Sequence, residues 1–126
     1  MASGFEELKV WQECRKFKQE ISKLTKTFPK HELYGLTSQL NNAARSVTAN
    51  IAEGYGRYHY GENIQFCRHS RGSLEEVKDH LYTAFDEDYI NQEGIDKLFT
   101  MHKMCISMLN GYIDWLKKQK DNLDNK

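Results

Sequence analysis

The chain has 126 residues, and its 18 Lys and Arg balance 18 Asp and Glu. A chain of this length can form one domain with its own core, and 29% charged with 12% aromatic residues is not the composition of a disordered protein. We expect neither a membrane span nor a secretory signal, because no run of about 18 apolar residues occurs and charged sequence follows Met1–Phe5 directly. Cys14, Cys67 and Cys105 are widely spaced and form no CxxC motif, which favours reduced thiols in the cytoplasm.

The first two helices are predicted over residues 6–27 and 34–55, on either side of Pro29, the only proline. In the first, apolar residues recur every three or four positions, which is typical of a helix packed against others: Val10, Cys14, Phe17, Ile21, Leu24 and Phe28. The apolar positions of the second become small toward its end, which lets a neighbouring helix approach closely: Leu36, Leu40, Ala43, Val47, Ile51 and Gly54.

The third helix is predicted over residues 61–86. Its apolar face is Phe66, Ser70, Ser73 or Leu74, Val77, Leu81 and Phe85. Ser70, Gly72 and Ser73 are expected to lie opposite the small residues of the second helix in an antiparallel hairpin. A glycine inside a helix costs ~1 kcal/mol relative to alanine, so we expect close packing at Gly72 to compensate.

The fourth helix is predicted over residues 92–119, with Asn91 as its N-cap and residues 121–126 as a frayed polar tail. Its apolar face is Ile95, Leu98, Met101 or His102, Cys105, Leu109, Tyr112 and Leu116. No alternating pattern suggests a strand. The sequence therefore predicts an all-α single domain over residues 1–126, an antiparallel up-down-up-down four-helix bundle.

No catalytic constellation is evident in the sequence. A di-iron bundle needs Glu-x-x-His pairs, and the chain contains none. The pairs Glu76 with His80 and His102 with Cys105 each share a helix face but lack matching partners, and the cysteines lie on or beside apolar stripes. Gly54 and Gly56 follow a helix rather than a strand, which is not the context of a dinucleotide-binding loop. We expect no enzyme activity, no cofactor and no metal.

Charge is unevenly distributed along the chain. Residues 1–31 hold seven basic and four acidic residues, whereas residues 72–100 hold two basic and eight acidic. Basic side chains can neutralise phosphates, and aromatic rings among cations are typical of single-strand binders. The nucleic-acid-binding candidates are Lys9, Arg15, Lys16, Arg45, Arg57, Tyr58 and Arg68. The alternative interpretation is a solvated helix face with ordinary loop aromatics.

Four blocks in order carry a family resemblance: Leu8–Trp11, Phe28–Pro29 followed by Tyr34–Gln39, Asn50–Arg57, and Arg71–Glu76. Together they resemble the four-helix-bundle family encoded in intervening sequences of 23S ribosomal RNA genes, sometimes labelled S23 ribosomal protein. The resemblance covers about Phe5 to Lys118. The chain departs from the family pattern on the second helix, where Asn41 and Asn42 replace basic residues and Arg45 replaces an apolar one.

The resemblance implies a left-handed four-helix bundle that assembles as a ring-shaped homopentamer. It also implies kinship with the accessory variability proteins of diversity-generating retroelements, which bind nucleic acid and a reverse transcriptase. Independently, the many amphipathic rings and the separation of basic and acidic segments favour self-assembly, with a monomer as the alternative.

Polar and small residues inside the distinctive blocks are interpreted as structural: Asn50, Glu53, Gly54, Arg71, Gly72, Ser73 and Glu76. Our hypothesis is that Arg71 pairs with Asn50 or Glu53 and fixes the register of the hairpin, rather than taking part in catalysis. The predicted function is a cytoplasmic, non-enzymatic oligomeric scaffold that binds nucleic acid or a nucleic-acid-handling protein. The alternative is a protein–protein adaptor without nucleic-acid affinity.

Overall fold

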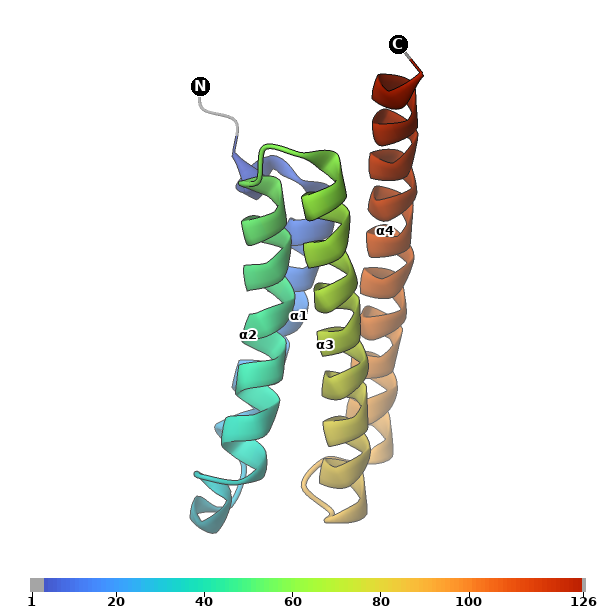
Figure 1. The fold of residues 1–126 in the computed structure, drawn as a ribbon. Coiled ribbons are helices and arrows are strands. Elements are labelled where there is room, and N and C mark those ends of the chain that lie inside the picture. Colours follow the sequence, from blue (N-terminus) through green and yellow to red (C-terminus); the bar gives the residue numbers. More distant parts are fainter. Residues whose placement is uncertain (1–3, 126) are drawn as a thin grey trace.

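The computed structural model describes residues 4–125. Its elements in chain order are η1 (Phe5–Glu7), α1 (Lys9–Thr25), η2 (Lys30–Glu32), α2 (Leu36–Tyr55), α3 (Tyr60–Asp86) and α4 (Gln92–Asp124). Successive α-helices run antiparallel and pack along their lengths (Figure 1). The predicted all-α four-helix bundle is confirmed, and no strand occurs between residues 4 and 125.

Residues 1–3 and 126 lie outside the described part of the chain. Two predictions therefore lie partly outside the described residues. They are the absence of a secretory signal at Met1–Phe5 and the two ends of the predicted domain. Within residues 4–125, no helix has the length and apolar character needed to cross a membrane.

Side chains from all four helices form one buried core. The positions left open in the sequence are resolved as Leu74 and His102, both buried. Four predicted core positions are only half-buried: Leu24, Phe66, Phe85 and Tyr112. All but Phe66 still pack against the core, so the prediction is wrong for Phe66. Buried residues outside the predicted stripes of α3 and α4 include Ile64, Cys67 and Ile113.

The seam between α2 and α3 is a close approach of two backbones. A Cβ atom added to Gly54 would lie 2.7 Å from Asn63 Oδ1 and 3.0 Å from Phe66 Cβ, so only glycine fits without a shift. The Ser70 hydroxyl donates to the Val47 carbonyl oxygen at 2.7 Å. Small residues therefore face one another across this seam, as predicted for the hairpin.

Gly72 does not belong to that seam, and the expected close packing around it is wrong. Nothing lies within 4 Å of a Cβ atom added there, and the residue is exposed. Its neighbour Ser73 does face α2, with its hydroxyl 2.9 Å from that of Ser46. Each helical step turns the side-chain direction by about 100°, so one residue separates the seam from solvent.

Arg71 does not bridge the α2–α3 hairpin, which corrects our hypothesis for this residue. Its Nη1 atom donates to Asn110 Oδ1 at 2.7 Å and so connects α3 to α4. The proposed partners bond elsewhere: Asn50 Nδ2 donates to the Ser46 carbonyl within α2 at 2.8 Å, and Glu53 pairs with Arg57 in the loop after α2 at 3.3 Å. Ser70 and Ser73 already occupy the α2 side of α3, which turns Arg71 toward α4.

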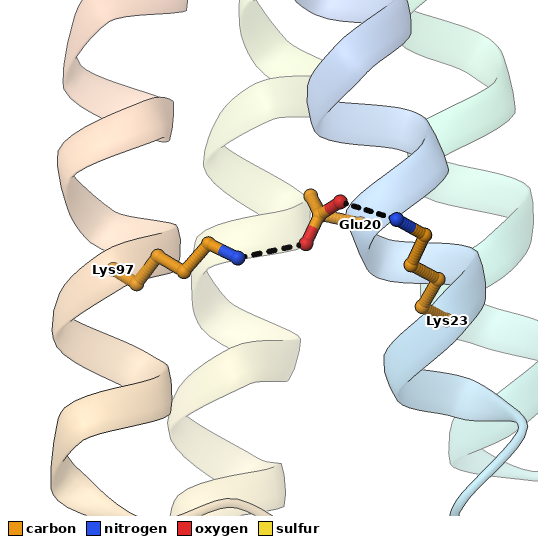
Figure 2. Close-up of polar contacts among 3 residues, drawn as sticks. All are labelled: Glu20, Lys23 and Lys97. Atoms are coloured by element: carbon orange, nitrogen blue, oxygen red, sulfur yellow. Dashed lines mark hydrogen bonds and ion pairs between the residues drawn. The ribbon is translucent and has the colours of Figure 1, made fainter.

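The seam between α1 and α4 is held by longer side chains. Figure 2 shows Glu20 of α1 between two lysines, with 3.0 Å from its carboxylate oxygens to Lys23 Nζ and to Lys97 Nζ of α4. The hydrogen bonds from Lys97 and then Lys23 lower the pKa of the Glu20 carboxyl. The pair is near the surface, so it orients the two helices more than it stabilises them.

The ends of α4 differ in how well the sequence predicts them. Asn91 is the N-cap, as predicted, and its side-chain oxygen accepts from the Gly94 backbone N–H at 2.8 Å. The C-terminal end is wrong, because α4 continues to Asp124 instead of fraying after residue 119. Residues 120–124 are exposed and contain no glycine or proline, so the helix continues without a packing face.

Candidate nucleic-acid interface

One end of the bundle brings cations from two helices together. Arg68 of α3 and Lys117 and Lys120 of α4 line a groove of about 280 Å³, together with Gly61, Ile64 and Asp121. The three cations are exposed. We call this groove, with the α2–α3 loop beside it, the cationic end. Three cations against one lining carboxylate give it a surplus of positive charge.

The start of α3 and the end of α4 lie close together, so side chains from both helices line the groove. A Cβ atom added to Gly61 would lie 3.5 Å from Lys120 Cε, so the lysine stem packs against the start of α3. His59 precedes α3 and makes no side-chain capping hydrogen bond. The N–H groups of the first turn of a helix attract anions, so the start of α3 adds to the positive potential.

Aromatic side chains surround the same end. Tyr58 in the α2–α3 loop is 96% exposed. On the neighbouring part of α4, Trp115 is half exposed, lies edge-on to Tyr60 and stacks nearly parallel to Tyr112, with an interplanar angle of 10°. Exposed ring faces beside cations can stack on unpaired bases.

Arg57 is at this end but is held by its own neighbours. Its guanidinium lies 3.3 Å from the Glu53 carboxylate and 3.7 Å from that of Glu62, and 4.9 Å from the centre of the Phe66 ring. Two acidic partners leave little of its charge for a ligand. Arg57 therefore fixes the loop between α2 and α3, next to the exposed Tyr58.

The other predicted residues do not line this groove. Lys9 is exposed at the start of α1, Arg15 lies over the Trp11 ring at 5.7 Å, and Lys16 is 3.7 Å from Glu13. Arg45 lines a separate groove between α1 and α2. Of the seven candidates, the structure brings Lys9, Arg57, Tyr58 and Arg68 to one end, and Arg15, Lys16 and Arg45 lie further along α1 and α2 (Figure 1).

Lys117 and Lys120 were not among the nucleic-acid-binding residues predicted from the sequence. The sequence signal for them was the surplus of basic residues after position 100, which holds five Lys against three Asp. Lys120 lay beyond the predicted end of the fourth helix. Its place opposite Gly61 and Arg68 depends on α4 continuing past residue 119.

The pairs considered for catalysis occupy structural positions. His102 is buried, and its Nε2 atom lies 3.0 Å from both the Leu74 carbonyl oxygen and Glu75 Oε1. Both neighbours are acceptors, so Nε2 carries the proton. Burial lowers the pKa of His102 more than nearby Glu75 raises it. His80 lies 3.4 Å from Glu76, one turn away on α3.

The three cysteines are fully buried and free, as predicted from their place on the apolar stripes. Burial raises the pKa of the Cys67 thiol to about 11, and a hydrogen bond with Cys105 raises that of Cys14. Both shifts disfavour the nucleophilic thiolate at Cys14 and Cys67. Among residues 4–125 no three His, Cys, Asp or Glu side chains form a cluster that could hold a metal ion.

These features define a small antiparallel four-helix bundle with a cationic groove between the start of α3 and the end of α4. The family model for 23S rRNA-intervening sequence proteins matches residues 6–111. The chain therefore belongs to the family of 23S rRNA-intervening sequence proteins, which confirms the resemblance of the sequence blocks. A comparison with curated proteins gave no match.

Proposed function

We propose that this protein is a non-enzymatic, cytoplasmic, oligomeric scaffold that binds single-stranded nucleic acid at the cationic end. The observation that supports this most directly is the groove shared by Arg68, Lys117 and Lys120. Each phosphate that such side chains neutralise releases condensed counterions, which favours binding at low ionic strength.

The exposed rings favour a single strand over a duplex. Tyr58 in the loop before α3 is 96% exposed, and Trp115 on α4 is half exposed with one ring face stacked on Tyr112. Bases of a duplex are already stacked on one another, whereas those of a single strand can stack on protein rings. RNA and DNA share this chemistry, and the family's link to ribosomal RNA genes makes RNA the first probe.

A salt-dependent gel shift with single-stranded RNA tests this function. We expect a shift at low salt that weakens steeply as salt rises, and weaker binding to a duplex of the same sequence. No shift at low salt would contradict nucleic-acid binding and favour the protein–protein adaptor. A partner of the reverse-transcriptase type, and kinship with accessory variability proteins, remain predictions from the family resemblance.

Self-assembly is supported by a second apolar stripe on α4. Met104, Met108 and Gly111 recur at spacings of four and three beside the core face, where Met104 is about half exposed and Met108 is partly buried against the core. A helix with two apolar faces favours a partner on the second. We expect the assembly to be the pentamer implied by the family resemblance.

Sedimentation velocity at several concentrations tests this assembly. We expect wild type to sediment as an oligomer and Met104→Asp to dissociate it, because the new charge would lie within the contact. A wild-type protein that stays monomeric at all concentrations would contradict self-assembly. Gln65→Asp places the same residue at an exposed position of α3, so it is the matched control and should leave the sedimentation unchanged.

A further inference from the structure

A larger groove lies at the opposite end of the bundle. It has a volume of about 500 Å³ and is formed by the end of α1, the η2 connection and the first half of α2. We call it the α1–α2 groove. Its apolar lining comes from Phe28, Pro29 and Leu33. Leu33 is 54% exposed in the connection between the helices, so the protein itself leaves this leucine uncovered.

Three cations line the same groove. They are Lys26 at the end of α1, Lys30 in η2 and Arg45 on α2, and no carboxylate is among the lining residues. Within the described part of the chain, none of the three forms an ion pair. Apolar surface next to uncompensated positive charge fits a ligand with aliphatic and acidic groups side by side.

We propose that the α1–α2 groove binds an acidic amphipathic segment of a partner protein. A large aliphatic side chain of that segment lies against Leu33 and Pro29, and its Asp and Glu side chains pair with Lys26, Lys30 and Arg45. Burying the aliphatic side chain favours binding, and the flanking ion pairs select acidic segments over basic ones.

Nucleic acid fits this groove less well. The only ring in the lining is Phe28, which is 8% exposed and packs against Tyr89 inside the bundle at 5.2 Å between ring centres. Phe28 therefore offers no ring face to a base, and the exposed Tyr34 next to Leu33 is not among the lining residues. The apolar lining is also poorly matched to a phosphodiester chain, which has no aliphatic side group to bury.

A second copy of this chain also fits less well. Its acidic turn, Asp86–Asp88, is followed by Tyr89 and Ile90, which already pack against the protein's own core. The other exposed leucine near acids is Leu123, beside Asp124. Lys117, Lys118 and Lys120 precede it on the same helix, so the end of α4 is not acidic.

The test is selection from a random peptide display library on the folded full-length protein, followed by affinity measurements on synthetic peptides. We expect enriched peptides to combine Asp and Glu with Leu, Ile or Met. Their affinity should fall about tenfold for Arg45→Glu, through lost charge complementarity, and for Leu33→Asp, through lost apolar contact. Lys117→Glu makes a like charge reversal at the cationic end and should leave peptide affinity unchanged.

Several outcomes would overturn the proposal. They are an absence of enriched peptides, enrichment of peptides without acidic residues, and equal binding to wild type and both groove variants. Loss of oligomers on Leu33→Asp, with an unchanged circular dichroism spectrum, would assign the groove to a second copy instead. Loss of single-stranded RNA binding on Arg45→Glu but not on Lys117→Glu would assign it to nucleic acid. Lys117→Glu changes only the cationic end. If peptides do not bind the α1–α2 groove, RNA binding at the cationic end can therefore still be tested separately.

Discussion

The two ends of this bundle each offer a groove lined by three cations, yet their neighbours differ. At the cationic end, Arg68, Lys117 and Lys120 lie near exposed rings. In the α1–α2 groove, Lys26, Lys30 and Arg45 surround an exposed leucine and a buried ring. Cations alone attract any anion, so the adjoining side chains decide between a base that stacks and an aliphatic group that is buried.

Charge reversal at each end in turn gives the largest expected difference. Lys117→Glu with Lys120→Glu should weaken single-stranded RNA binding about 100-fold at low salt and reduce the slope of log affinity against log salt by about 2. Lys26→Glu with Lys30→Glu changes the net charge equally and should have a much smaller effect. Fluorescence anisotropy over a salt series measures both, and equal losses would mean that only net charge matters.

The seam between α2 and α3 holds α3 in place, and α3 connects the two ends of the bundle. Gly54→Ala should lower the free energy of unfolding by about 2 kcal/mol, because its Cβ atom would collide with Asn63 and Phe66. Gly72→Ala is the matched control in open space and should raise it by about 0.5–1 kcal/mol. Urea denaturation measures both variants. Equal changes of the same sign would refute the close approach at Gly54.

Removing a ring sharpens the distinction between stacking and charge. Tyr58→Ala should weaken single-stranded RNA binding about tenfold, since one base loses a stacking partner worth about 1–3 kcal/mol. The side chain is 96% exposed, so stability should not change. Tyr34→Ala is the control, because that tyrosine is 93% exposed near the other end. Fluorescence anisotropy measures the affinities. An unchanged affinity for Tyr58→Ala would contradict stacking of a base on this ring.

The smallest effect expected is on the pH dependence of the free energy of unfolding. His102 is buried against α3, and burial lowers its pKa below the value of 6.5 expected in the unfolded chain. Its contribution to stability is therefore full above pH 6.5 and is lost as pH falls through the folded-state pKa.

Urea denaturation between pH 7 and pH 5 checks this sign. The free energy of unfolding should fall on acidification in wild type and fall less in His102→Leu, whose side chain does not titrate. A profile that is equally steep in both proteins would place the titrating group elsewhere.

Hydrophobic periodicity was enough to predict the four helices, because each buries a stripe at helical spacing along most of its length. It did not predict the end of α4, since residues 120–124 are helical without a buried face. It left Met101 and His102 undecided, as the two differ by one step on the same helix.

The site was predicted only where the residues lie close in sequence. Arg57, Tyr58 and Arg68 belong to one segment, whereas Lys117 and Lys120 join them through packing of the start of α3 against the end of α4. The partner of Arg71 was predicted wrongly for the same reason. Asn110 is on α4, whereas the predicted partners are on α2, the other helix of the hairpin. The α1–α2 groove was not predicted either. It is formed in part by the connection between α1 and α2, whose path cannot be predicted from hydrophobic periodicity because it is not α-helical.

Ultraviolet cross-linking of bound single-stranded RNA, with mass spectrometry of the linked peptides, tests the central claim most directly. If nucleic acid binds at the cationic end, cross-links will map to peptides containing Tyr58 or Trp115 and will disappear in Lys117→Glu with Lys120→Glu. Cross-links confined to the α1–α2 groove, or unchanged by that double substitution, would contradict the account.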